Sequence, residues 1–286
     1  MIDGEFELDG YAFGTEDHEV WVQTLDLGTR EQLTADAPIS GGVGRVMGRD
    51  SEDAPEWTFD LRVRRGGGTF DALGRLRAAW QGHAEPGALS VLRYSLPGRV
   101  RRVYGRPRRF TPDADAVRHA WHHGRAPVLA SFQLADPRVF DDVARSVTLS
   151  VVPASVGGLE APLVAPLSTV RSSAPRAGLV DAAGDAPAPV TVTFQGPITD
   201  PWVRGPGWEV GLSGHIAYDQ TVTVDALAAT ATLSPGGASV GGRLTRRTRL
   251  RDAVLRPGQQ ELTFGGSDQT GTATVTISWR DAWWSL

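Results

Sequence analysis

The chain has one cluster of histidines, His119, His122 and His123. A His-x-x-His pair places two imidazoles on one face of a helix, which is a spacing found at zinc sites. A third ligand would have to come from elsewhere in the chain, and the neighbouring acids Asp113 and Asp115 are weak candidates. Because the segment runs into a turn that contains Gly and Pro, the pattern favours a polar loop or a short helix over a metal site.

Nucleophilic catalysis finds no support in the sequence. The stretch Gly211–His215 contains a Ser between two glycines, but a nucleophile elbow needs Gly at its fifth position and a turn from strand to helix. Gly66–Gly68 precede a helical pattern, yet the chain has no Lys and the run lacks the spacing of a P-loop. The absence of Cys excludes a Cys nucleophile, a thiolate metal site and a disulfide. We therefore expect a protein that is not an enzyme and uses no metal or cofactor.

Arginines are concentrated between Arg99 and Arg109. Such a run resembles a nucleic-acid footprint, but few aromatic residues are interleaved with it. The whole chain is also acidic, with a pI of about 5.9, whereas a dedicated DNA-binding protein is usually basic. A basic face that receives an acidic neighbour explains the same residues. We therefore expect Arg101, Arg102, Arg108 and Arg109 at an interface between subunits.

The net charge of −4 conceals an uneven distribution. Residues 1–60 contain 15 acids and 3 arginines, a net charge of −12, whereas residues 61–153 contain 7 acids and 16 arginines, a net charge of +9. The two parts pair within one domain, pair between neighbouring copies, or form separate solvated faces. For a pairing between copies, the acidic part before Asp60 is expected to meet the basic part after Leu61 of the next subunit.

Hydropathy places the chain among globular proteins. Hydrophobic residues make up 41% of it and charged residues 22%. No apolar run approaches the ~18 residues that span a bilayer, and the acidic start of the chain differs from a signal peptide. We therefore expect that the protein is synthesised in a cytoplasm and does not insert into a membrane.

Strand patterns dominate both halves of the chain. Apolar residues alternate with Thr, Ser or charged residues between turns rich in Gly, Pro and Asp, in residues 57–64, 190–194, 208–212, 220–225 and 272–279. Residues 91–104 have the pattern of a hairpin around Pro97 and Gly98. One helical period runs from Thr69, the expected N-cap, to Trp80. The fold class is therefore mainly β, with one helix in the first half.

Domain organisation follows from where these patterns stop. Between residues 152 and 190 the sequence becomes rich in Ala, Pro, Gly and Ser, without a period of 2 or 3.6. We therefore predict an N-terminal domain over residues 1–153, a linker over 154–189 with one or two short strands (159–167 or 168–172), and a C-terminal domain over 190–286. Both domains have an ordinary size.

Several motifs together resemble one family. They are Phe6–Gly14, Leu61–Phe70 and Ala135–Asp142 near the start, and Leu255–Gly258, Glu261–Phe264, Gly271–Arg280 and Trp283–Leu286 near the end. The first group is similar to the N-terminal domain of siphophage distal tail proteins. The second group resembles minor tail proteins of phages that infect high-GC actinobacteria.

The resemblance implies a fold and a function. The N-terminal domain would be a β-sandwich related to tail-tube subunits, and it would close into a hexameric ring. The C-terminal domain would be a galectin-like jelly-roll sandwich. The homo-hexamer would lie in the virion at the distal end of the tail, after synthesis in the host cytoplasm. It would join the tail-tube protein to the tail-tip hub protein, and DNA would contact it only in transit.

Two other classes of function remain open. A carbohydrate- or receptor-binding module would take a host surface glycan by stacking sugar rings on Trp202, Trp208, Tyr218 or Trp283. Against this, the polar sugar ligands of true galectins have no counterpart, since Asn is absent, and the Trp side chains also suit a sandwich core. A wall-digesting hydrolase would need paired carboxylates or a metal site, and the sequence offers neither.

Overall fold

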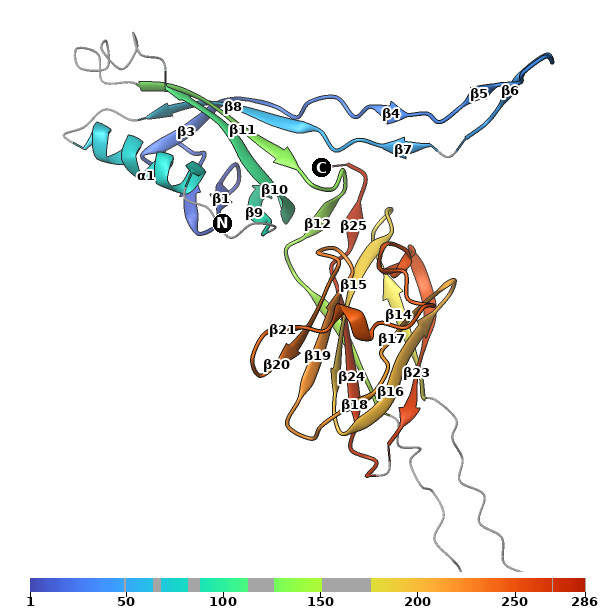
Figure 1. Ribbon diagram of the computed structural model, residues 1–286. Coiled ribbons are helices and arrows are strands. Elements are labelled where there is room, and N and C mark those ends of the chain that lie inside the picture. Colours follow the sequence, from blue (N-terminus) through green and yellow to red (C-terminus); the bar gives the residue numbers. More distant parts are fainter. Residues whose placement is uncertain are drawn as a thin grey trace, which may run out of the picture. The chain divides into compact units, whose positions relative to one another are not determined.

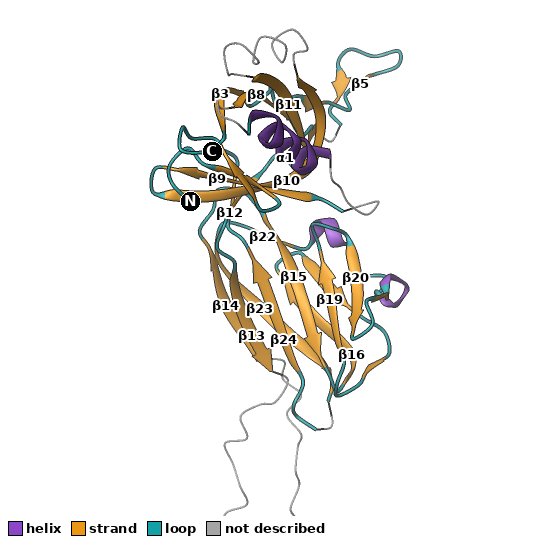
Figure 2. Ribbon diagram, turned by 90° about the vertical axis from the view of Figure 1, so that its left-hand side faces the viewer, coloured by secondary structure: helices purple, strands orange, loops and turns teal. Residues whose placement is uncertain are grey.

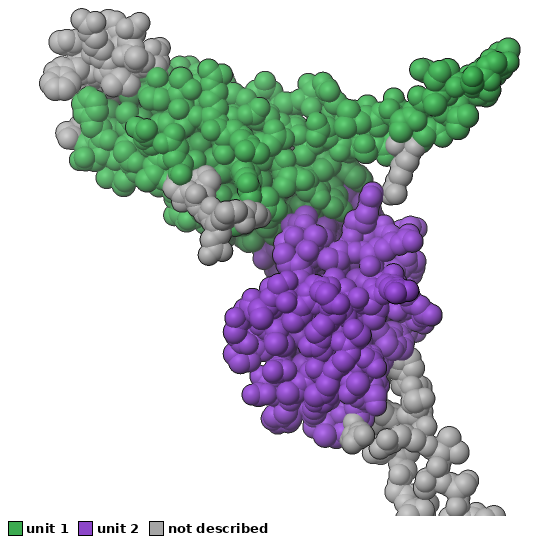
Figure 3. Space-filling view, viewed as in Figure 1, with its two compact units in different colours: residues 1–142, 284–286 green, residues 143–283 purple. Residues whose placement is uncertain are grey.

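The structure is a computed structural model that describes residues 1–48, 50–63, 68–81, 88–112, 126–150, 176–268 and 270–285. The chain forms two compact units, Met1–Asp142 with residues 284–286, and Val143–Trp283 (Figure 3). Both are built from antiparallel strands (Figures 1 and 2). The prediction of a mainly β protein is therefore confirmed.

Unit 1 is built on one curved sheet with the strand order β2-β1-β9-β10-β11-β8-β3. The strands are β1 (Phe6–Leu8), β2 (Tyr11–Phe13), β3 (Val20–Asp26), β8 (Glu56–Val63), β9 (Ser90–Leu96), β10 (Arg99–Pro112) and β11 (Ala126–Leu134), and β12 (Val139–Asp141) pairs with β10. A bridge between Gly14 and Trp21 joins the two ends of this order. The two layers of this unit are therefore opposite halves of one sheet that curves until its edges meet.

The helix α1 (Thr69–Gln81) completes the core of unit 1. Its buried side chains are Ala72, Leu76 and Trp80. The Trp80 ring packs edge-on against Phe13 and Phe59, with centroids 5.8 and 5.7 Å apart. The predicted helix is thus present and covers one face of the sheet.

An arm that the sequence analysis did not predict connects β3 to β8 (Figure 1). It contains two short ladders, β4 (Gln32–Leu33) with β7 (Ser51–Glu52) and β5 (Ala37–Pro38) with β6 (Arg45–Val46). All eight residues of these ladders are exposed. We call residues 27–55 the arm.

Unit 2 is a sandwich of two sheets. One has the order β13-β24-β15-β19-β20-β21, with β22 beside β15, and the other has the order β14-β23-β16-β17, with β18 beside β16. The strands are β13 (Arg145–Ser150), β14 (Arg176–Ala182), β15 (Ala188–Gln195), β16 (Ile198–Gly205), β17 (Trp208–Gly211), β18 (His215–Ile216), β19 (Thr221–Asp225), β20 (Thr230–Ser234), β21 (Ala238–Ser239), β22 (Val254–Leu255), β23 (Gly258–Ser267) and β24 (Thr274–Trp279). The short strand β25 (Ala282–Trp283) follows β24 and belongs to neither sheet. The short 3₁₀ helices η1 (Gly241–Arg243) and η2 (Leu250–Asp252) precede β22. Phe194 of β15 meets Phe264 of β23, with ring centroids 6.2 Å apart, so the core lies between the sheets.

The boundary between the units differs from the predicted one. Unit 1 ends at Asp142 and not at 153, because β13 pairs with β24 along Arg145–Ser150. The predicted linker also contains β14, which pairs with β23, and the start of β15, which pairs with β22. Large apolar residues are few in these stretches, so their local alternation is weak and distant strands determine the pairing.

Some sequence predictions fall outside the described residues. They are the histidine cluster at 119–123 with its neighbouring acids, Gly66 and Gly67 of the glycine run, and the short strands expected within 159–172.

Candidate interaction surfaces

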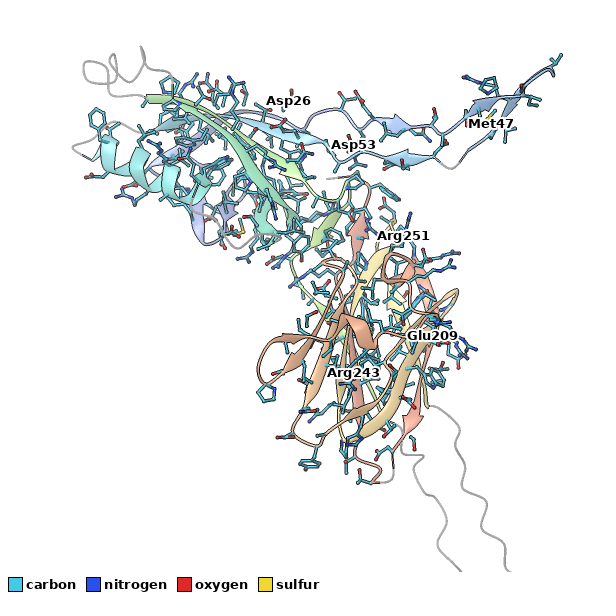
Figure 4. All side chains as sticks on the ribbon, viewed as in Figure 1. Asp26, Met47, Asp53, Glu209, Arg243 and Arg251 are labelled. Carbon is cyan, nitrogen blue, oxygen red and sulfur yellow. The ribbon has the colours of Figure 1, made fainter. Side chains whose placement is uncertain are left out.

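The arm exposes apolar side chains that have no core to enter. Val43 is 101% exposed, Met47 77% and Val46 60%, and Leu33 and Ile39 are exposed as well. Figure 4 shows Met47 on the arm. An isolated two-stranded hairpin is marginally stable in water, and clustered exposed apolar groups mark interaction sites. The arm therefore has the composition of a segment that a partner surface covers.

Acidic side chains accompany these apolar groups on the arm. Asp36 accepts a hydrogen bond from the backbone N–H of Gly48 at 2.9 Å, and Asp50 accepts one from Gln32 Nε2 at 3.0 Å. These bonds hold the two sides of the arm together. Within the described part of the chain no arginine forms an ion pair with an arm carboxylate. The arm has five acids and three arginines in its sequence, so it has a net negative charge of −2.

Arg101, the first of the four predicted interface arginines, is 1% exposed. Its Nη1 donates a hydrogen bond to the carbonyl oxygen of Ser285, and its Nε lies 3.7 Å from Asp141 Oδ1. Because its side chain is enclosed within unit 1, the expectation that it faces another subunit is wrong. Arg101 has the same inward direction as Val103 two residues on, which is the alternation that β10 imposes.

Arg102 belongs to an internal ion-pair network. Its Nη2 lies 2.5 Å from Asp142 Oδ1, and Arg93 Nη2 lies 2.6 Å from Asp142 Oδ2. Arg93 Nη1 also donates to Glu7 at 3.1 Å. Burial alone raises the pKa of Asp142, but the hydrogen bonds from Arg93 and Arg102 outweigh it and leave this pKa below its usual value. Arg102 therefore stabilises its own unit and is not free for a neighbour.

Arg108 and Arg109 are exposed, unlike the first two. They lie where the register of β10 against β11 shifts between Pro107 and Phe110. Such a bulge re-aims side chains, and here both arginines point to solvent. Arg108 and Arg109 therefore remain candidates for the predicted interface between subunits.

The uneven charge of the sequence is partly neutralised inside unit 1. Arg75 Nη2 lies 2.5 Å from Glu19, and Arg62 pairs with Asp60. With the Glu7–Arg93 pair, these contacts join the acidic and basic parts of one chain. Pairing within the domain thus uses part of the charge, while the arm acids and the bulge arginines stay available.

The aromatic residues considered for sugar stacking are separated in unit 2. Trp208 is 6% exposed and lies over Gly205, where a Cβ would come 2.5 Å from its ring. Trp202 lies over Gly265, and the guanidinium of Arg204 covers its ring at 4.8 Å. Tyr218 is 74% exposed and lies in the loop between β18 and β19. Little of the Trp208 ring is therefore free to stack on a sugar, whereas Tyr218 is accessible, and sugar stacking stays a prediction.

Among the described residues no group of three His, Asp or Glu side chains is placed to hold a metal ion. No helix in the described ranges has the length and apolarity to cross a membrane.

Comparison with known proteins gives the fold a precedent. Neither family models nor curated protein sequences match this chain. Among solved structures, SPP1 Dit, described as a paradigm of the hub adsorption apparatus in phages infecting Gram-positive bacteria, has a TM-score of 0.58 at 15% identity. That similarity covers 97% of this chain and 98% of SPP1 Dit. A chain of the phage P2 baseplate in its activated conformation with Ca has a TM-score of 0.53 at 11% identity, over 96% of this chain and 97% of that one. The structural neighbours of this protein are therefore phage Dit and baseplate proteins. Their fold is the one expected of a siphophage distal tail protein.

Proposed function

We propose that this chain is a structural, non-enzymatic protein of a phage tail tip. In this proposal it forms a hexameric ring at the distal end of the tail, joins the tail-tube protein to the tail-tip hub protein and leaves a passage for DNA. The observation that carries the proposal is the likeness in fold to SPP1 Dit, which extends over 97% of this chain and 98% of the other. Unit 1 would supply the ring, and unit 2 would be the galectin-like sandwich.

The exposed side chains of the arm favour the ring proposal. A closed ring uses two different patches on each subunit, so one patch meets the other on the next copy. The arm offers exposed apolar side chains at Val43, Val46 and Met47, with its acids in residues 31–36 and 50–53, and the bulge of β10 offers a basic patch with Arg108 and Arg109. Apolar contact would supply most of the affinity, and opposite charge would set the register and disfavour like-to-like pairing.

The ring is tested with the purified full-length protein by native mass spectrometry and negative-stain electron microscopy. We expect a closed ring with a central hole, whose mass falls toward monomer as salt rises, because exposed charges are screened over about 8 to 10 Å. Val46→Asp with Met47→Asp should weaken assembly. The matched control, Leu179→Asp with Tyr218→Asp, changes two comparably exposed apolar residues of unit 2, at 67% and 74% exposed, and should leave assembly unchanged.

Arginine variants separate interface from core. Arg108→Glu with Arg109→Glu should weaken the ring while the monomer stays folded. Arg101→Glu should unfold unit 1 instead, because a buried carboxylate would replace the guanidinium beside Asp141. A monomer at all salt concentrations, or a dimer with two-fold symmetry, would contradict the ring proposal.

A further inference from the structure

Unit 2 contains an open hollow of about 520 Å³ beside a loop rich in arginine. Its lining comes from the β16–β17 turn, with Arg204, Trp208 and Glu209, and from residues 243–252, with Arg246, Arg249 and Asp252. We call residues 243–252 the arginine loop. Five arginines fall within nine residues of this loop, a second concentration of arginine besides the run at 99–109.

The arginine loop is held rigidly against the sandwich. Thr245 donates its backbone N–H to the carbonyl of Gly211 at 2.9 Å, and Thr248 Oγ1 accepts from the N–H of Gly211 at 2.9 Å. Arg243 donates to the carbonyls of Ser213 and His215 at 3.0 and 2.8 Å (Figure 4). The loop therefore has little freedom to lose when a ligand binds, which favours affinity.

Positive charge remains at the hollow after internal pairing. Four arginines line it, 204, 246, 247 and 249, against the two acids Glu209 and Asp252, which leaves a net charge of +2. Glu209 Oε2 lies 2.6 Å from Arg204 Nη2 and 3.9 Å from Arg247 Nη1. Arg246 and Arg249 are exposed and form no ion pair with any residue that the structure describes. A guanidinium binds phosphate and carboxylate groups through paired donors, so these two arginines select an anion.

A buried donor in the lining is also without an acceptor. The Nε1–H of Trp208 has no hydrogen-bond partner among the described residues, and it lies next to Gly205, which lines the same hollow. Buried donors are nearly always satisfied, so this unpaired N–H is an unusual feature next to the lining of the hollow.

The mixture of charges decides which anion fits. A nucleic acid carries a dense line of negative charge, which Glu209 and Asp252 repel. Single strands also need exposed aromatic faces, but Trp208 is 6% exposed and Arg204 covers Trp202. Carboxylates next to arginines suit a ligand that has hydroxyl groups as well as anionic ones, because a carboxylate accepts hydrogen bonds from hydroxyls.

We propose that this hollow binds an acidic saccharide, one that carries phosphate or carboxylate groups beside free hydroxyls. Arg246 and Arg249 hold the anionic group, and Asp252 accepts from a neighbouring hydroxyl. The proposal concerns unit 2 alone and does not depend on ring formation.

Binding is measured by isothermal titration on the full chain at low salt. The probes are phosphomannan for the phosphate form, an oligogalacturonate for the carboxylate form, neutral dextran and a mixed-sequence DNA duplex. We expect at least one of the two acidic saccharides to bind, and we expect dextran not to bind. Arg246→Gln with Arg249→Gln should weaken binding about tenfold or more. The matched control, Arg99→Gln with Arg256→Gln, removes the same charge from exposed arginines outside the hollow and should change binding by less than about twofold.

A further variant separates recognition from simple charge attraction. Asp252→Asn removes a negative charge, so a merely basic surface would bind an anion more tightly. In a saccharide site the variant loses its best hydroxyl acceptor and should bind more weakly. Circular dichroism checks that each variant is folded. Absence of binding to both acidic probes, equal losses in the two double variants, tighter binding by Asp252→Asn, or DNA binding as tight as either saccharide would overturn the proposal. Loss of the ring in native mass spectrometry with saccharide binding intact would contradict the proposed function alone.

Discussion

Replacing Trp80 with Phe tests how much α1 contributes to unit 1. Trp80 is 2% exposed, packs edge-on against Phe13 and Phe59, and donates its Nε1–H to the carbonyl of Ser131 at 3.0 Å. The variant keeps an aromatic ring but loses this hydrogen bond. Leaving a buried carbonyl unsatisfied costs about 1–3 kcal/mol. The smaller ring also leaves a cavity, and since complete truncation of Trp or Phe costs about 3–5 kcal/mol, partial truncation adds roughly 1–2 kcal/mol.

The expected loss in the free energy of unfolding of unit 1 is thus about 2–5 kcal/mol, a large share of the 5–15 kcal/mol typical of a domain. Urea unfolding followed by far-ultraviolet circular dichroism measures it. The transition of unit 2 is an internal reference, because Trp80 belongs to unit 1. Phe70→Ala is the control on the same helix, at a side chain that is 52% exposed. A loss no larger for Trp80→Phe than for Phe70→Ala would refute the assignment of Trp80 to the core.

Two further predictions concern the ion-pair network and the segment between the strands of unit 2. Asp142→Asn should destabilise unit 1 by about 1–3 kcal/mol at neutral pH, through the weakened hydrogen bonds from Arg93 and Arg102. Burial raises the pKa of Asp142, but those hydrogen bonds lower it by more, so the net pKa lies below its usual value. The contribution of Asp142 to stability is therefore present above about pH 4 and is lost as the pH falls below that. Urea midpoints of wild type and variant that do not converge in acid would contradict this. Limited proteolysis should cut within residues 151–175, which are rich in Ala, Pro, Gly and Ser and contain no aromatic residue, and spare Arg176–Ala182, because β14 pairs with β23 there. Mass spectrometry of the fragments checks the site, and cleavage inside β14 would show that its pairing is weak.

The sequence alone determined the mainly β class and the position of several elements. The alternation in residues 57–64 became β8, in which every second side chain from Trp57 to Val63 is buried. The helical period from Thr69 became α1, with Leu76 and Trp80 inside. These elements were predictable because a period of 2 or 3.6 in a short window reflects one buried face, which local sequence records directly.

Only the tertiary structure decided the arm, the unit boundary and the candidate surfaces. The arm has no apolar period, because neither of its faces is buried in this chain. The boundary depends on β13, whose partner β24 lies far along the sequence, and local pattern cannot select a distant partner. Arg101 and Arg108 look alike in the sequence, yet β10 buries the first and its bulge exposes the second. The hollow of unit 2 arises because the fold brings the arginine loop beside the β16–β17 turn, a juxtaposition of segments that no spacing in the sequence expresses.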